Sequence, residues 1–237
     1  MCTKYLCKRW QGLLEAIINF AGQGYVYYHV TYLPAKKLNK ADKIDQKILQ
    51  KYNLINDTKD KRYHRKKRGL ANFRYLRWEH IIVILHTEGT IIQRGQEEKH
   101  LTRFKLEQAK KHAVTYDDSF SDIRVKPMVL AISEQLELEV RYLPKKNVGQ
   151  KLTVRLTKKM FRDKKAELAA LAEKRAKDKI VYVFNALNNL PAWRGIIIQK
   201  RQLYRFVMTQ ARKHNFTFQK GELMVGDYRP KEKDIFV

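Results

Sequence analysis

Arginines recur with helical spacing close to the C-terminal end of the sequence. At about 100° per residue, four of them fall within roughly 40° of one another on one side of a helix, and we call them the arginine stripe. They are Arg194, Arg201, Arg205 and Arg212. Guanidinium groups bind phosphate oxygens through two parallel hydrogen bonds, whereas an ordinary exposed helix face alternates Glu with Lys. From Arg194 to Lys220 the sequence has seven basic residues and no acidic one, so it predicts phosphate contact along this stripe.

A second basic segment, 59–68, reads KDKRYHRKKR, and seven of its ten residues are Lys or Arg. It supplies charge together with planar rings, as looped or single-stranded nucleic acid would require. The other interpretation is a disordered basic loop that binds any polyanion weakly. Both interpretations predict nucleic-acid contact here. The predicted contact residues are Lys61, Arg62, Tyr63, His64, Arg65, Lys66, Lys67 and Arg68, extended into the following strand by Arg74 and Arg77.

Aromatic residues in the same part of the chain have two interpretations. They could form an exposed platform on which bases stack, or they could fill the core beneath a sheet, which is the commoner arrangement. The residues concerned are Tyr27, Tyr28, Tyr32, Phe73 and Tyr75.

The order of a strand (YYHVTYLP), a helix and paired strands ending in His86 loosely resembles the opening layout of the HUH nucleases. That family needs two histidines separated by one residue on a strand and a nucleophilic tyrosine on a helix. Here His80 and His86 are six residues apart, about 20 Å along a strand, so one metal ion could not bind both. A site for Mg²⁺ or Mn²⁺ formed by His80 with Glu79 or His29 stays an alternative. The corresponding nucleophiles would be Tyr182 and Tyr204.

Several longer segments resemble a basic bacterial protein family of unknown function. They are GLANFRYLR (69–77), LHTEG (85–89), DKIDQKILQKYNL (42–54), SDIRVKP (121–127) and PAWRGIIIQKRQLYRF (191–206). The resemblance implies an association with mobile elements and carries no residue roles.

The composition of the whole chain agrees with a polyanionic partner. Its 237 residues include 50 Lys or Arg and 24 Asp or Glu, which gives a net charge of +26. A folded protein with this charge repels itself unless a polyanion neutralises it, and nucleic acid is the commonest such partner. No apolar run approaches about 18 residues, so no membrane span is predicted. Cys2 and Cys7 are too few for a disulfide scaffold or a structural zinc site, and they fit a reducing, cytoplasmic location.

The periodicity of apolar residues predicts an α+β fold with a mixed or antiparallel sheet and a helical C-terminal part. Helices are predicted over 10–21, 39–52, 97–112, 161–177, 180–190 and 195–214. Strands are predicted over 25–33, 71–77, 79–87, 123–132, 136–142 and 151–157, with a short closing hairpin from 216–218 and 223–228. The composition changes at residue 158. The predicted organisation is therefore an α+β domain over 1–157, with the basic segment at 57–70, and a helical region over 158–237 that packs on it or completes a single domain.

Together these patterns favour a cytoplasmic nucleic-acid-binding protein that needs no cofactor. RNA is favoured over duplex DNA, because the basic segments contain Tyr, His and Trp and no helix-turn-helix or zinc-finger motif occurs. Two alternatives stay open: a metal-dependent nuclease or transposase of the HUH type, and a structural component of a ribonucleoprotein particle. The sequence also leaves open the oligomeric state and a role in replication or in a mobile element.

Overall fold

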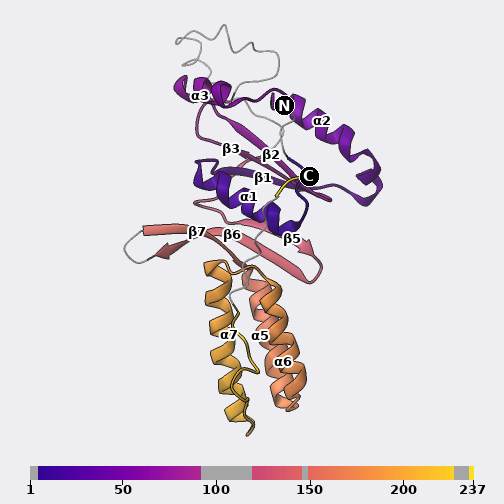
Figure 1. Cartoon of the computed structure of the whole chain (residues 1–237), viewed down its shortest axis with the longest axis vertical. Coiled ribbons are helices and arrows are strands. Elements are labelled where there is room, and N and C mark those ends of the chain that lie inside the picture. The colour runs from indigo at the N-terminus through magenta and orange to yellow at the C-terminus, as the bar shows by residue number, and fades with distance from the viewer. Residues whose placement is uncertain (1–4, 92–118, 146–148, 227–234) are drawn as a thin grey trace. The chain divides into compact units, whose positions relative to one another are not determined.

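The computed structural model describes residues 5–91, 119–145, 149–226 and 235–237. The chain divides into an N-terminal unit (Met1–Met128 with Asp234–Val237) and a C-terminal unit (Val129–Lys233). Each unit has its own antiparallel sheet and the C-terminal part is helical, so the predicted α+β class is confirmed (Figure 1). The division falls after residue 128 rather than at the predicted 157, because the second sheet packs with the C-terminal helices.

A four-stranded sheet in the order β2-β3-β1-β4 forms the centre of the N-terminal unit. Its strands are β1 (Tyr27–Tyr32), β2 (Phe73–Trp78), β3 (Ile81–His86) and β4 (Ser121–Asp122). All six residues of β3 are buried, as expected for a strand with a continuous apolar run. The register places Tyr27, His86 and Phe73 side by side across three strands, so their side chains share one face of the sheet.

Helices cover both faces of this sheet (Figure 1). They are α1 (Trp10–Gly22), α2 (Ala41–Lys51), which follows the 3₁₀ helix η1 (Ala35–Lys40), and α3 (Lys59–Lys67). On one face, Phe73 and Tyr75 share a core cluster with Leu49 of α2. On the other face, the guanidinium of Arg74 lies 4.8 Å from the ring centre of Phe20 in α1. This two-sided cover explains why β3 is buried throughout.

The outer edge of β2 is covered by segments from the two ends of the chain. Leu6 pairs in parallel with Arg77, and the N–H of Cys7 donates to the Arg77 carbonyl at 2.7 Å. Phe236 in turn pairs with Cys7, and the N–H of Val237 donates to the Leu6 carbonyl at 2.9 Å. An open strand edge invites pairing with other chains, and these added segments satisfy its backbone groups instead.

The C-terminal unit consists of a three-stranded sheet in the order β5-β6-β7 and the helices that follow it. The strands are β5 (Met128–Ser133), β6 (Leu136–Lys145) and β7 (Gly149–Leu156), and the helices are α5 (Lys158–Glu173), α6 (Lys177–Ala186), η3 (Leu187–Asn189) and α7 (Arg194–Lys213). Thr157 turns the chain from β7 into α5: its hydroxyl accepts from the N–H of Met160 at 3.3 Å and donates to Glu137 at 2.7 Å. The helical core is made by Leu168, Ala172, Ile180, Phe184, Leu203, Val207 and Ala211, all buried.

The described part of the segment after α7 contains no strand, so the hairpin predicted from 216–218 and 223–228 is wrong for these residues. Two asparagine amides hold the segment instead. Asn185 donates to the Glu222 carbonyl at 2.8 Å and accepts from the N–H of Met224 at 2.9 Å. Asn188 donates to the Met224 carbonyl at 2.9 Å. These amides supply the backbone hydrogen bonds that a second strand would have supplied.

Two further sequence expectations concern other parts of the chain. The helix predicted over 97–112 lies outside the described residues. Among the residues that are described, no helix has the length and apolar character needed to cross a membrane.

Candidate nucleic-acid interface

Three members of the arginine stripe lie on the exposed face of α7. Arg201, Arg205 and Arg212 are exposed, whereas Leu203 and Val207 on the other side of the helix are buried. In the part of the chain that the structure describes, none of the three has a carboxylate within ion-pair distance. They therefore present three unneutralised guanidinium groups along about 16 Å of helix, at 1.5 Å per residue.

The fourth member, Arg194, is used within the unit. Its guanidinium donates to the carbonyl of Pro144 at 2.8 Å, so this arginine joins the first turn of α7 to the end of β6. Lys200, also on α7, is buried, and its Nζ donates to the Asn188 side chain at 3.3 Å. Neither residue extends the exposed charge of Arg201, Arg205 and Arg212.

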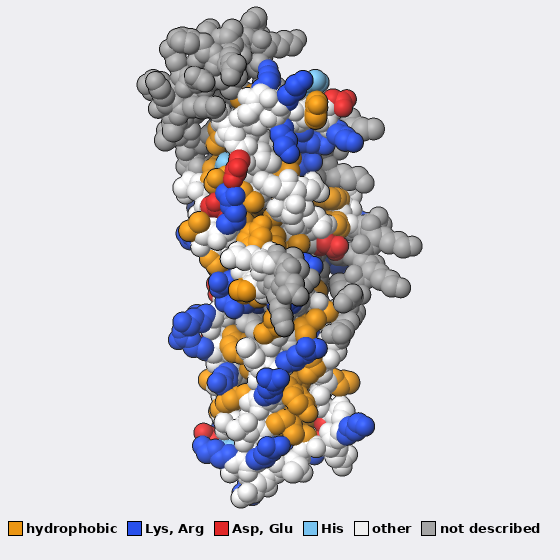
Figure 2. Space-filling model, turned by 90° about the vertical axis from the view of Figure 1, so that its left-hand side faces the viewer, with side chains coloured by type: hydrophobic (Ala, Val, Ile, Leu, Met, Phe, Trp, Pro, Cys, Tyr) orange, Lys and Arg blue, Asp and Glu red, His pale blue; other side chains and the backbone are white. Residues whose placement is uncertain are grey.

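Basic side chains dominate the charged surface around α7. Residues 158–226 contain 16 Lys or Arg and five Asp or Glu. Figure 2 shows Lys and Arg spread over this helical part with apolar side chains between them and few acidic groups. Tyr204 contributes to this surface: it is 36% exposed, and its ring centre lies 6.2 Å from that of the buried Phe184. The surface thus combines guanidinium groups with one supported aromatic ring.

The inner face of α7 is attached to the edge strand β7 by side chains that replace a neighbouring strand. The Gln199 amide accepts from the N–H of Leu156 at 2.8 Å and donates to the Leu156 carbonyl at 3.0 Å. The N–H of Gly195 donates to the Thr153 hydroxyl at 3.0 Å. These bonds fix the rotation of α7 about its axis, and that rotation keeps Arg201 and Arg205 outward.

The basic segment 59–68 is a helix rather than a disordered loop, because α3 spans most of it. Thr58 caps it by accepting from the N–H of Lys61 at 3.3 Å. The exposed side chains of the helix include Lys61, Tyr63, His64, Lys66 and Lys67, with Tyr63 63% exposed. The ring centres of Tyr63 and His64 are 5.6 Å apart. Charged side chains and aromatic rings are therefore exposed together on the outer side of α3.

The arginines of the same helix point inward, which corrects the prediction that the whole segment contacts phosphate. Arg65 is 6% exposed, and its guanidinium donates to Asp57 at 2.7 Å. Arg62 donates to the same carboxylate at 2.7 Å, and Arg74 of β2 lies 3.9 Å from it. The Asp57 side chain is fully buried among these three guanidinium groups. The three arginines and Asp57 thus attach α3 to the sheet. Arg68, at the end of the helix, is half-buried.

Arg77 is likewise a structural residue and not a phosphate contact. It is buried, and its Nε donates to the buried Asp45 of α2 at 2.9 Å. Tyr75 donates its hydroxyl to the same carboxylate at 2.5 Å, and burial beside this carboxylate raises the pKa of Tyr75 far above its usual range. A buried carboxylate with two donors ties α2 to the face of the sheet that α2 covers.

The aromatic residues of the sheet belong mainly to the core, so an exposed stacking platform is not formed. Tyr28, Phe73 and Tyr75 are buried and Tyr27 is half-buried, leaving Tyr32 as the exposed member of the set. The Tyr28 hydroxyl donates to the carbonyl of Pro127 at 2.9 Å.

The described histidines are not brought together in the way that the alternative metal site would require. His86 is 6% exposed and stacks on Tyr27 with ring centres 4.7 Å apart. His80 lies in the turn before β3, and the Nδ1 of His29 donates to the Ser119 carbonyl, 3.0 Å away. Among the described residues no three His, Cys, Asp or Glu side chains gather as metal ligands. The proposed nucleophiles Tyr182, which is 78% exposed, and Tyr204 lie on α6 and α7 of the other unit.

The burial of His86 leads to a prediction about pH. Desolvation lowers the pKa of His86 below its usual 6.5, against the opposing effect of its hydrogen bond to the Thr87 carbonyl. Because the unfolded chain then binds a proton that the folded chain does not, stability is retained above about pH 6.5 and falls as the pH drops below it. His86→Phe, which keeps a ring beside Tyr27, is expected to show a smaller loss of unfolding free energy between about pH 7 and pH 5 than the unchanged protein. Urea unfolding at both pH values measures this difference.

The control for this experiment is His64→Gln, because that side chain is exposed in the folded protein. This change should leave the pH dependence of unfolding as it is. An equal pH dependence in His86→Phe and in the unchanged protein would mean that the buried imidazole is not the source.

Comparison with known proteins assigns no family to this arrangement. Neither protein-family models, nor curated proteins, nor solved structures match the chain.

Proposed function

We propose that this protein binds nucleic acid through its phosphate backbone, with the exposed face of α7 as the principal contact surface. The observation that carries the proposal is the row formed by Arg201, Arg205 and Arg212, which has no carboxylate partner in the described part of the chain. Guanidinium groups without counter-charges repel one another, and this cost is removed when phosphates bind between them.

The spacing of these arginines supports a linear polyanion. Arg201 and Arg205 are about 6 Å apart along the helix axis, and Arg212 lies about 10 Å further on. One nucleic-acid strand carries a phosphate about every 3.4 Å along a duplex axis, so the row spans roughly five nucleotides. A small anion would fill only one position of such a row.

The outer side of α3 is the second proposed contact surface. Lys61, Lys66 and Lys67 supply charge beside the exposed rings of Tyr63 and His64. Aromatic rings next to cations bind unpaired bases by stacking, and duplex DNA keeps its bases inside the helix. Tyr204 stands in the same relation to Arg201 and Arg205. These pairs support single-stranded or looped RNA as the preferred ligand.

Salt dependence tests the proposal directly. If Arg201, Arg205 and Arg212 each displace a counterion, the logarithm of affinity should fall linearly with the logarithm of salt concentration, with a slope steeper than about −2. Fluorescence anisotropy of a labelled oligouridylate between about 50 and 200 mM salt measures the slope. A labelled duplex DNA of equal length, titrated in parallel, compares the two ligand classes. A flat salt response would remove the electrostatic basis of the proposal.

The biological setting of this binding is a further proposal, either within a ribonucleoprotein particle or together with a mobile element. Sequencing the nucleic acid that copurifies with the protein would separate these settings. No arrangement of the described residues favours strand cleavage as a second function.

A further inference from the structure

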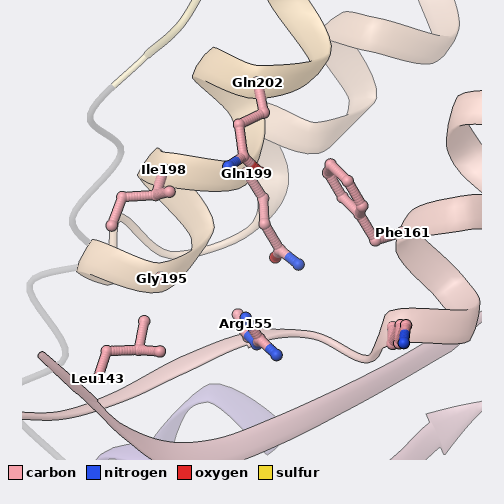
Figure 3. A pocket seen from close by; sticks show the side chains of 8 residues that line it. Leu143, Arg155, Phe161, Gly195, Ile198, Gln199 and Gln202 are labelled. Atoms are coloured by element: carbon pink, nitrogen blue, oxygen red, sulfur yellow. The ribbon is translucent and has the colours of Figure 1, made fainter.

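A pocket of about 210 Å³ lies within the C-terminal unit, at the start of α7 (Figure 3). It is lined by Leu143, Arg155, Lys158, Phe161, Gly195, Ile198, Gln199 and Gln202. In Figure 3 the first turns of α7 stand over the β6–β7 hairpin, Gln199 points toward Arg155, and Phe161 enters from α5. The lining of the pocket therefore combines two cationic side chains, Arg155 and Lys158, with apolar and amide side chains.

Arg155 is held in position by a buried carboxylate. Its Nε donates to Glu139, whose side chain is 10% exposed, and the Arg155 side chain itself is 27% exposed. A guanidinium fixed in this way is preorganised for an oxyanion, since it loses little freedom on binding.

Because Glu139 is paired with Arg155, the net positive potential around the pocket comes from Lys158 and from the two helices that begin here. Helices α5 and α7 both begin at this end of the unit, and neither has an acidic residue in its first turn. Their first residues are instead Lys158 and Arg194, although helix N-termini favour negative charge. The positive ends of the two helices are therefore not neutralised by acidic side chains, and a cationic side chain stands at each. An anion bound in the pocket would lower the resulting positive potential.

The walls indicate what the anion is attached to. Phe161 offers a ring face, and Gln202 at the opening offers one donor and one acceptor group. The amide of Gln199 is already used at both ends by Leu156, so it serves as a fixed wall. The volume is below the roughly 300–1,000 Å³ usual for drug-sized ligands, so the pocket suits one mononucleotide better than a dinucleotide cofactor.

We infer that this pocket binds one nucleotide, with its phosphate at Arg155 and Lys158 and its base against Phe161 and Gln202. The inference rests on the proposed function, because such a nucleotide would come from a strand held along α7. It adds to the proposed function a defined binding site for one nucleotide, beside a surface that is otherwise characterised only by its positive charge.

Titration of the full-length protein with uridine 5′-monophosphate tests the site without a strand. Lys158 lines the pocket, whereas the adjacent Lys159 does not, and both are exposed in the first turn of α5. Lys158→Gln is expected to weaken binding of this nucleotide at least about fivefold, which is about 1 kcal/mol, and Lys159→Gln less than twofold. Equal effects of the two changes, or no binding by the unchanged protein, would overturn the inference.

A second variant checks the base. Phe161→Leu keeps an apolar side chain and removes the ring, so it should weaken uridine 5′-monophosphate more than inorganic phosphate. Retained phosphate binding by this variant also shows that it is folded. If phosphate and nucleotide are weakened equally, the base does not lie on Phe161 and the nucleotide assignment fails.

Strands distinguish the source of the nucleotide. If Lys158→Gln weakens a 5′-phosphorylated oligouridylate and spares the 5′-hydroxyl form, the pocket holds a strand end; if it weakens both, the pocket holds an internal nucleotide. If it weakens neither, the inference is wrong. If Lys158→Gln has no effect on strand binding, but replacement of Arg201 and Arg205 still abolishes it, the proposed function remains supported and only the pocket assignment is wrong. Absence of any strand binding would remove the proposed function, while the mononucleotide titration would still decide on the pocket.

Discussion

Gly195→Ala is expected to destabilise the C-terminal unit by about 3 kcal/mol. A Cβ built at Gly195 collides with the carbonyl oxygen of Val154 and lies 3.0 Å from the Cβ of Arg155. The neighbour is strand backbone and cannot rotate away, so α7 must lift from β7. That shift would also break the bond from the Gly195 N–H to Thr153. If the whole chain unfolds in one transition, the decrease in Tm measured by thermal unfolding should be roughly 6–12 °C, and it should be larger if the C-terminal unit unfolds by itself.

The matched control is Gly22→Ala at the end of α1. Nothing lies within 4 Å of a Cβ added there, and the backbone of Gly22 is not in the left-handed region. Alanine has the higher helix propensity, so stability should be unchanged or should rise by up to about 1 kcal/mol. Equal Tm values for Gly195→Ala and the unchanged protein would show that α7 does not pack against β7 as closely as described.

Local sequence patterns were sufficient to predict most of the elements. The alternation of β6 has a period that only a strand satisfies, and the apolar run of β3 is rich in β-branched residues, which favour strands. The outward direction of Arg201, Arg205 and Arg212 followed from the helical period of α7 and the apolar residues on its other side. These predictions depend on neighbours within a few residues, which the sequence displays directly.

The arginines that turned inward could not be identified in this way. Arg65 and Arg77 look like surface residues of a basic stretch, yet each is buried and paired with a buried carboxylate from another part of the chain. Asp45, which binds Arg77, is 32 residues away in sequence. Asp57, which binds Arg65, is eight residues away, but its burial depends on the packing of α3 and β2. Tertiary contacts can bury an arginine although arginines are usually exposed. The spacing of residues in the local sequence gives no sign of such burial.

The pocket was missed for the same reason. Leu143 comes from β6, Arg155 from β7, Phe161 from α5, and Gln199 and Gln202 from α7, so four separate elements build it. One signal was present: Lys158 and Lys159 open a helix where acids are usual. Composition alone assigned both lysines to the general positive charge of the chain.

Replacing Arg201 and Arg205 by Gln is expected to weaken oligouridylate binding about 25- to 60-fold at about 0.1 M salt. Each lost phosphate contact removes about 0.7 to 0.9 from the slope of log affinity against log salt, so two contacts remove about 1.4 to 1.8. The two contacts contribute almost nothing to affinity near 1 M salt. Over the tenfold decrease to about 0.1 M salt, the change in slope therefore corresponds to a loss of about 25- to 60-fold in affinity. Because both side chains are exposed and opposite the buried Leu203, the fold should persist and Tm should change little.

The control for the arginine pair is Lys174→Gln with Lys179→Gln, which removes two exposed charges from the same unit away from α7. If the nucleic acid is held only by the net positive charge of the protein, both double variants should lose affinity equally. Direct contact depends on position, so only the arginine pair should reduce the salt slope by more than one. Weakening should be the same for all base sequences, since phosphate contacts carry no base information. Equal losses in the two double variants would mean that net charge, and not the face of α7, holds the nucleic acid.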